Sequence, residues 1–251
     1  MNIPKIIHYC WFGNNPLPES AMKCINSWKK YFPDYEIKEW NETNYNVNII
    51  PFTTEAYNNN KYAFVSDFAR FDILYKEGGI YFDTDVEIIK SFNNILNNSF
   101  LGMETTGRIN PGLGCGFYAC HKIISEIIDY YYNLNFNDFI KNNNTIVDIT
   151  TDILTNNGFI KNNSIQNVSD ITIYPCDYFN PIDYDTHYLH ITQNTHSIHY
   201  GDASWIDKKR KFTAKIHIWL CRILGKKTGI YFSSIVRKSA KSIYKLLNQN
   251  D

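Results

Sequence analysis

The chain has 251 residues and a formal net charge of zero, from 25 Lys and Arg against 25 Asp and Glu. Hydrophobic residues make up 44% and aromatic residues 16%, which excludes a wholly disordered chain because so much apolar surface can form a core. The charge is unevenly divided: 12 of the 25 basic side chains follow residue 206, but only 2 of the 25 acidic ones. We therefore expect an acidic body, residues 1–206, and a basic tail, residues 207–251, with a partner of its own.

Two classes of protein are not indicated by the sequence. The first residues hold no apolar run typical of a secretory signal, and no apolar window reaches the length of a membrane span. The six cysteines form no C-x-x-C pair, so a zinc ribbon or a redox motif is not expected. We expect a cytoplasmic protein.

Short apolar runs alternate with helical patterns along the chain. The run from Ile3 stops at Gly13 and predicts a buried strand, and Pro16 and Pro18 introduce the first helix. Alternation of this kind predicts an α/β fold with a mainly parallel sheet flanked by helices, in which ligands bind at the carboxyl ends of strands. The predicted strands are residues 3–12, 35–40, 79–82, 86–89, 100–104, 115–120, 171–174 and 197–200, and the predicted helices are residues 16–31, 61–75, 123–135 and 148–157.

The tail has a different pattern. From Phe232 to Leu247, apolar residues recur at spacings of three and four with Lys and Arg between them, which predicts a basic amphipathic helix. Residues 216–224 predict a shorter helix of the same kind. The tail either contacts a membrane surface or packs its apolar stripe on the body.

The motif Asp83-Thr84-Asp85 follows a predicted strand. Two carboxylates two residues apart in extended chain point to the same side, and their charges are costly together unless they meet a cation. A hard divalent ion such as Mg²⁺ or Mn²⁺ takes oxygen ligands and also binds phosphates. The alternative is a pair of exposed turn aspartates.

A second charged pair precedes this motif. Asp67 and Arg70 are three residues apart, so they share one face of the predicted helix. The residues around them are mostly apolar, which indicates a largely buried helix whose charged groups need partners. Sugar hydroxyls or a phosphate would supply such partners; the alternative is a surface salt bridge.

The order and spacing of these motifs resemble glycosyltransferase family 32. The resemblance rests on Ser66-Asp67-x-x-Arg70, on Gly78-Gly79-Ile80-Tyr81-Phe82-Asp83-Thr84-Asp85, and on the two end segments, residues 3–13 and 197–205. It covers residues 1–206. That family includes bacterial capsular and exopolysaccharide transferases, Golgi initiating mannosyltransferases and the catalytic domains of large glucosylating toxins.

The resemblance implies a GT-A catalytic domain, a Rossmann-like sheet, over residues 1–206. It also implies Mn²⁺- or Mg²⁺-dependent transfer from a nucleotide-sugar with retention at the anomeric carbon, and uridine is the nucleoside that it favours. Asp85 would bind the metal directly, Asp83 would contact the ribose and the metal, and Asp67 and Arg70 would hold the donor sugar. Together these four make up the implied catalytic set. The implied donor-binding residues are Tyr9, Trp11, Asp67, Arg70, Tyr81, Asp83, Ser204 and Trp205.

Two parts of the implied site stay open. His199 is a candidate third metal ligand, Asp202 is a rival, and a hydrogen-bonded core histidine is the alternative. Asn110 and Gly112, in a loop whose glycines permit close approach to a ligand, are candidate acceptor contacts, or an ordinary turn. Asp152 is a candidate acceptor contact or part of a helix cap.

Three functions are consistent with these features. The first is a transferase that moves a hexose to a glycan or lipid-linked acceptor in cell-surface polysaccharide synthesis. The second is a toxin-like effector that glycosylates a host protein, and the third is a non-catalytic nucleotide-sugar binder. A lipid-linked acceptor would favour an anionic membrane surface as the partner of residues 207–251, at the inner face of the plasma membrane. We expect no nucleic-acid partner.

Overall fold

The structure, a computed structural model, describes residues 2–201 and 208–235, with the backbone alone for residues 208–212. The chain divides into two compact units. The described part of the first is residues 2–181 and 191–201, and that of the second is residues 182–190 and 208–235. Over these ranges, no helix has both the length and the apolar composition that are needed to cross a bilayer.

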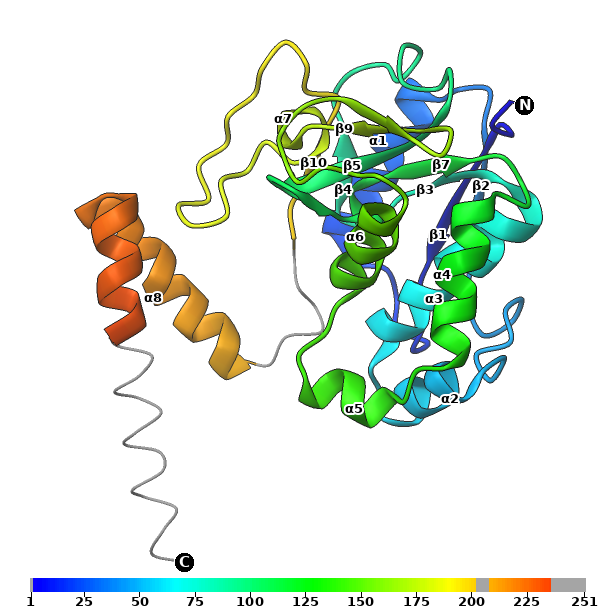
Figure 1. Cartoon of the computed structure of the whole chain (residues 1–251), viewed down its shortest axis with the longest axis horizontal. Coiled ribbons are helices and arrows are strands. Elements are labelled where there is room, and N and C mark those ends of the chain that lie inside the picture. The colour runs from blue at the N-terminus through cyan, green and yellow to red at the C-terminus, as the bar shows by residue number, and fades with distance from the viewer. Residues whose placement is uncertain (1, 202–207, 236–251) are drawn as a thin grey trace, which may run out of the picture. The chain divides into compact units, whose positions relative to one another are not determined.

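The first unit is built on a twisted sheet in the order β2-β1-β3-β7-β5-β9-β8, with β6 paired to β5 (Figure 1). Five of the seven strands on this path run in one direction, and β7 and β8 run against them. The expected α/β class and mainly parallel sheet are therefore confirmed. The strands are β1 Ile6–Cys10, β2 Glu36–Trp40, β3 Gly79–Tyr81, β5 Ser99–Thr105, β6 Arg108–Ile109, β7 Cys115–Phe117, β8 Gln166–Val168 and β9 Ile171–Tyr174.

Side chains alternate between two cores, one on each face of the sheet, because successive residues of a strand point to opposite sides. Ile80 and Phe82 enter one core, with helix α1, and Tyr81 enters the other. Helices α2 to α6 cover the face that receives Tyr81. The helices are α1 Glu19–Tyr31, α2 Pro51–Asn58, α3 Tyr62–Glu77, α4 Lys122–Tyr132, α5 Phe136–Lys141, α6 Ile146–Asn156 and α7 Cys176–Phe179, and Pro111–Leu113 form the short 3₁₀ helix η1.

A separate two-stranded ribbon joins β4 (Val86–Ile88) and β10 (Ser197–His199) in antiparallel register. Helix α1 borders this ribbon through side chains of three of its residues. Trp28 Nε1 donates to Val86 O at 2.7 Å, Ile88 N donates to Ser27 Oγ at 2.8 Å, and Tyr31 OH donates to Ile89 O at 2.7 Å. The helix therefore takes the place of a neighbouring strand along β4.

The second unit contains helix α8 (Lys208–Leu224), a turn at Gly225 with φ +77°, and a helical stretch over residues 226–235. The shorter predicted helix, residues 216–224, is therefore confirmed. The longer predicted helix begins in helical residues 232–235, and its remainder lies outside the described residues. The division of function between residues 1–206 and 207–251 stays a prediction.

Candidate active site

The Asp-Thr-Asp motif lies in the turn that connects β3 of the main sheet with β4 of the ribbon. Two backbone hydrogen bonds hold this turn: Asp83 N donates to Gly112 O, and Val86 N donates to Asp83 O, both at 3.1 Å. Tyr200 N, just after β10, donates to Asp85 O at 3.1 Å. The turn is thus tied both to η1 and to the ribbon.

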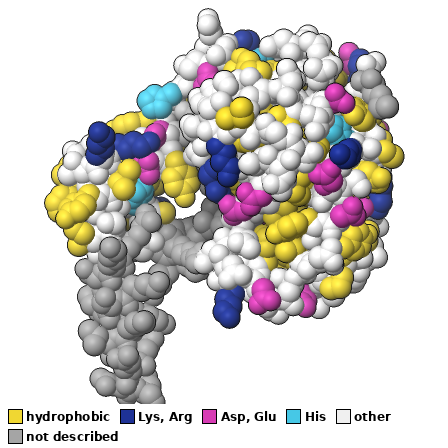
Figure 2. Space-filling view, in the orientation of Figure 1, with side chains coloured by type: hydrophobic (Ala, Val, Ile, Leu, Met, Phe, Trp, Pro, Cys, Tyr) yellow, Lys and Arg dark blue, Asp and Glu magenta, His cyan; other side chains and the backbone are white. Residues whose placement is uncertain are grey.

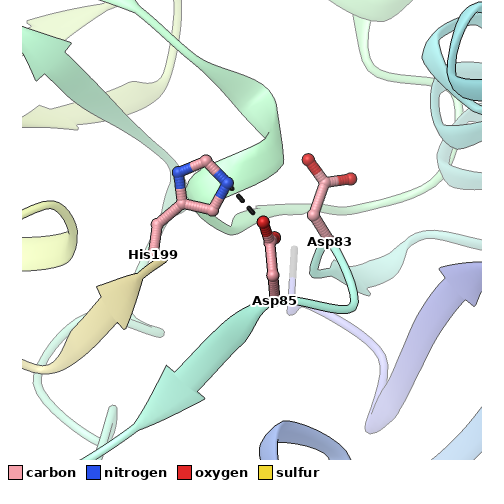
Figure 3. A group of neighbouring side chains, drawn as sticks. All are labelled: Asp83, Asp85 and His199. Carbon is pink, nitrogen blue, oxygen red and sulfur yellow. Dashed lines mark ion pairs between the residues drawn. The ribbon is translucent and has the colours of Figure 1, made fainter. Parts of the chain in front are cut away.

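Asp83, Asp85 and His199 point toward one another (Figure 3), and their candidate ligand atoms all lie within 4.8 Å of each other. Asp83 comes from the end of β3, Asp85 from the start of β4 and His199 from the last position of β10. His199 Nε2 lies 3.2 Å from Asp85 Oδ1. The structure therefore brings together the two motif carboxylates and the histidine expected as a third ligand.

Arg70 connects this cluster with α3. Its Nη2 lies 2.8 Å from Asp67 Oδ1 and 3.2 Å from Asp83 Oδ1, and its guanidinium stacks 4.7 Å from the centre of the Tyr81 ring. Tyr81 OH also donates to Asp83 Oδ1, at 3.1 Å. The Arg70 side chain is 4% exposed, so the pair is buried and the surface salt bridge is excluded.

One donor atom in this group lacks a hydrogen-bond partner within the described residues. Arg70 Nη1 is buried and has no hydrogen-bond partner within the described part of the chain. Because an unsatisfied buried donor is costly, this atom is available to an anionic or hydroxyl oxygen at the cluster.

Electrostatics at the cluster match a site for a cation. Burial raises the pKa of Asp67 to about 7, against the opposing effect of Arg70. Burial also raises the pKa of Asp83; Arg70 opposes this rise and Asp85 adds to it. Burial lowers the pKa of His199, but the nearby carboxylates, Asp85 first, outweigh burial and hold this pKa above its ordinary value. Arg70 and His199 thus offset part of the cost of burying these carboxylates, and a divalent cation bound there would favour their charged forms further.

The donor set fits a divalent metal. Two carboxylates and one imidazole suit Mn²⁺, and a metal site needs further positions for water or phosphate oxygens, which a partly exposed cluster can provide. The side chains of Asp83, Asp85 and His199 are 30%, 17% and 17% exposed. These three residues would hold the ion.

The loop at η1 forms the neighbouring wall. Asn110 Oδ1 accepts from Gly112 N at 2.8 Å, and Asn110 Nδ2 donates to Glu104 Oε2 at 3.0 Å. A Cβ on Gly112 would overlap the Asp83 carboxylate and come within 3.1 Å of Arg70 Nη1. Of the predicted acceptor contacts, Gly112 therefore lies directly beside the cluster, and Asn110 holds Gly112 through its backbone N–H.

Other predicted site residues lie elsewhere. Tyr9 is buried in the core that contains α1, where its OH donates to Glu39 Oε2 at 2.6 Å and its ring packs edge-on to Trp28. Trp11 is half-buried and donates from Nε1 to Asn15 O at 2.6 Å. The Asp152 side chain is 74% exposed and lies 4.0 Å from Lys161. Their assigned roles stay predictions, while Asp202, Ser204 and Trp205 lie outside the described residues.

Glu104 lies beside the site, although the sequence pattern did not indicate it as a site residue. The Glu104 carboxylate lies near the cluster. Its Oε2 accepts from Asn110 Nδ2, its Oε1 lies 3.3 Å from Arg108 Nε, and its charge helps to raise the pKa of His199. Asn180 Nδ2 donates to the Glu104 carbonyl at 2.9 Å. The one available signal was the position of Glu104 at the end of a predicted strand.

Parts of this chain are similar to known proteins. Residues 18–101 match the family described as "Glycosyltransferase sugar-binding region containing DXD motif". Inositol phosphoceramide mannosyltransferase 3 of Schizosaccharomyces pombe is 33% identical over 143 residues, 54% of this chain and 39% of that protein. Inositol phosphoceramide mannosyltransferase 1 of the same organism is 29% identical over 153 residues, 55% of this chain and 46% of that protein. This chain therefore spans less than half the length of either relative.

Two further similarities were found. An uncharacterized glycosyltransferase of Acanthamoeba polyphaga mimivirus is 26% identical over 253 residues, 92% of this chain and 91% of that protein. A solved structure titled PaToxG Glycosyltransferase has a TM-score of 0.47 and 19% identity, covering 62% of this chain and 70% of that one. Residues 18–101 are thus similar to a glycosyltransferase sugar-binding region, and Asp83-Thr84-Asp85 has the form of a DXD motif within that range.

Proposed function

We propose that this protein is a metal-dependent, retaining glycosyltransferase that moves a hexose from a nucleoside-diphosphate sugar to a glycan or lipid-linked hydroxyl. The observation that carries the proposal is the convergence of Asp83, Asp85 and His199 beside the buried, unpartnered Nη1 of Arg70. A non-catalytic binder is disfavoured because both motif carboxylates are present and face one point.

Each residue has a role in this proposal. Asp83, Asp85 and His199 would hold Mn²⁺ or Mg²⁺, which when bound neutralises charge on the leaving diphosphate. Arg70 is oriented by Asp67 and Asp83 and presents Nη1 to a donor oxygen, where its fixed charge stabilises negative charge that develops on departure. Tyr81 and Gly112 keep the Asp83 carboxylate in place.

The reaction needs no separate general base. The bond between the anomeric carbon and the diphosphate oxygen breaks, and a bond from the acceptor oxygen forms on the same face. The acceptor proton passes to the departing diphosphate. Asn110 and Gly112 lie where they could contact the sugar or the acceptor.

The donor and acceptor proposals come from the relatives' names. Two relatives are inositol phosphoceramide mannosyltransferases, so mannose is the first sugar to test and a lipid-borne hydroxyl the first acceptor. We propose a uridine or guanosine diphosphate as the carrier and cell-surface glycan synthesis, at the cytoplasmic face of the membrane, as the setting.

The test combines a donor screen with a charge variant. Uridine- and guanosine-diphosphate hexoses are screened for hydrolysis and for thermal stabilisation, with and without Mn²⁺. We expect Asp85→Asn to lower turnover by about 100-fold or more, since a metal ligand is lost, and to abolish the Mn²⁺-dependent thermal shift. Asp129→Asn, which removes an exposed carboxylate on α4, is the matched control. Full turnover by Asp85→Asn would rule out the metal role.

A further inference from the structure

Exposed apolar side chains are concentrated in the second unit. Of the 18 large hydrophobic residues that are exposed over the described chain, 10 lie in residues 182–190 and 208–235, a small fraction of its length. Solvated proteins seldom expose a group of apolar side chains of this kind without a partner. The ten are Tyr184, Tyr188, Leu189, Trp219, Ile223, Leu224, Ile230, Tyr231, Phe232 and Ile235.

The close packing of α8 against the helical residues 226–235 determines which of their side chains remain exposed. A Cβ on Gly229 would overlap the backbone of Cys221, so the two helices touch at this point. His217 and Ser233 are buried between them, with His217 Nδ1 and Ser233 Oγ 2.7 Å apart. Trp219 and Ile223, one helical turn apart, are therefore turned away from the partner helix and are 59% and 60% exposed.

The same helices are strongly basic. Residues 208–235 contain eight Lys and Arg and no Asp or Glu. Lys215 precedes Trp219 by one turn, and Lys227 follows the Gly225 turn, so cations flank the apolar side chains. Figure 2 shows dark blue and yellow side chains next to each other on these helices.

Ionic contacts attach the loop of residues 182–190 to α8 and to the helical stretch of residues 226–235. Lys226 Nζ lies 2.7 Å from Asp183 and 3.0 Å from Asp185, and His217 Nε2 lies 3.1 Å from Asp185. Arg222 Nε donates to Thr186 O at 2.6 Å. These contacts use the loop's two acidic groups and leave Tyr184, Tyr188 and Leu189 exposed beside a basic surface.

We propose that this surface, formed by residues 182–190 and 213–235, binds the interfacial region of an anionic lipid bilayer. Trp and Tyr prefer the membrane–water interface, and the four Lys and Arg of this surface, which outnumber its two Asp, attract anionic headgroups. Charge complementarity thus favours a lipid surface. The sequence pattern indicated the tail alone; the structure adds the loop of residues 182–190. The inference does not rest on the proposed glycosyl transfer.

The test is cosedimentation of the full-length protein with vesicles, without donor or metal. We expect binding to phosphatidylcholine vesicles that contain phosphatidylglycerol, and much weaker binding to phosphatidylcholine alone. The triple variant Trp219→Ser, Ile223→Ser, Phe232→Ser should bind about 10-fold more weakly or worse, because its apolar contact area is lost. The double variant Ile160→Ser, Ile165→Ser, which removes two equally exposed apolar side chains from the first unit, should bind like the unaltered protein.

A charge variant tests the electrostatic part. Lys215→Gln with Lys227→Gln should lower the partition coefficient on anionic vesicles by about 5-fold per residue and leave binding to neutral vesicles unchanged. Circular dichroism verifies that each variant is folded. Equal sedimentation of the triple variant and the unaltered protein would overturn the proposal. So would a lipid-independent dimer that the triple variant dissociates, because the surface would then join two copies of the chain.

Discussion

Gly112 lies against the carboxylate of Asp83, and its lack of a side chain makes this contact possible. An added Cβ would overlap Asp83 Oδ2 and lie 2.9 Å from Asp83 Cγ. The residue is held by Asn110 Oδ1 on its N–H and by the Asp83 N–H on its carbonyl. A single methyl group here would move a proposed metal ligand without changing any charge.

Gly112→Ala should therefore impair the site more than the fold. We expect a loss of about 10- to 100-fold in turnover from misplacement of Asp83, and a cost of about 1–3 kcal/mol in the free energy of unfolding from overpacking. The measurements are turnover, the Mn²⁺-induced thermal shift and chemical denaturation. Gly158→Ala is the control, since open space surrounds Gly158 and only its φ of +104° is strained by a side chain. Equal loss of turnover in both variants would contradict the steric explanation.

For single residues, the sequence predicted the charged groups of the site better than the residues around them. Asp83, Asp85, Asp67 and Arg70 were found because short motifs keep them at fixed spacing. Asp152 stays a predicted acceptor contact, and the adjacent Thr151 is buried, with its Oγ1 accepting from Ile109 N at 2.9 Å. Adjacent helical residues point in directions about 100° apart, and only the packing of α6 determines which one faces inward.

Helix α1 takes part in the site through β4. Trp28 is fully buried, and its indole donates to Val86 O, one residue after Asp85. Ser27 Oγ accepts from the backbone N–H of Ile88 in the same strand, and Tyr31 OH donates to the carbonyl of Ile89, just after it. An edge strand of three residues, paired on its other side with β10 alone, depends on such support to keep its position.

Trp28→Phe should weaken both stability and metal binding. The Val86 carbonyl would lose its partner, at a cost of about 1–3 kcal/mol in the free energy of unfolding, and Asp85 would lose a fixed neighbour. Chemical denaturation and Mn²⁺ titration measure the two effects. Tyr31→Phe, which removes one hydroxyl farther along β4, should cost about 1 kcal/mol and leave Mn²⁺ affinity unchanged. Unchanged Mn²⁺ affinity in Trp28→Phe would show that α1 supports the fold alone.

Helices with a long periodic pattern were predicted well, and the short helices were not. α3 and α4 agree closely with their predicted ranges, and the turn into β3 was marked by Gly78-Gly79, both with positive φ. α2 and α5 are eight and six residues long, too short for a repeating apolar period, and were missed. The reversed direction of β7 was also missed, because a three-residue run of apolar side chains is the same in either direction.

The stability of the whole molecule depends on a histidine that must stay neutral. His8 is fully buried, accepts from Trp40 Nε1 at Nδ1 and contacts Gly78 O through Nε2. Burial lowers the pKa of His8 below 6.5. A histidine with a depressed folded pKa adds stability that is fully present above its unfolded pKa and is lost as the pH falls, since the unfolded chain then binds the proton first.

His8→Gln should therefore destabilise the protein more at pH 7.5 than at pH 5.5, because His8 contributes less to the stability of the unaltered protein at the lower pH. The measurement is the free energy of unfolding by urea at both pH values, for the variant and for the unaltered protein. Using the difference between the two proteins cancels the opposite contribution of Asp67, whose pKa is raised. His190→Gln, at an exposed histidine, is the control. An equal cost of His8→Gln at the two pH values would contradict the prediction.

The pairing of β4 with β10 also has a consequence for how the protein can be shortened or assembled. Asp85 and His199 meet across this ribbon although more than a hundred residues separate them in the chain. A fragment that ended after β9 would keep the motif, Arg70 and most of the sheet, but would lack both the histidine and the strand that pairs with β4. Because bringing distant segments together costs loop-closure entropy, we expect the contact between Asp85 and His199 to form late in folding. Formation of this contact would then show that β10 has paired with β4.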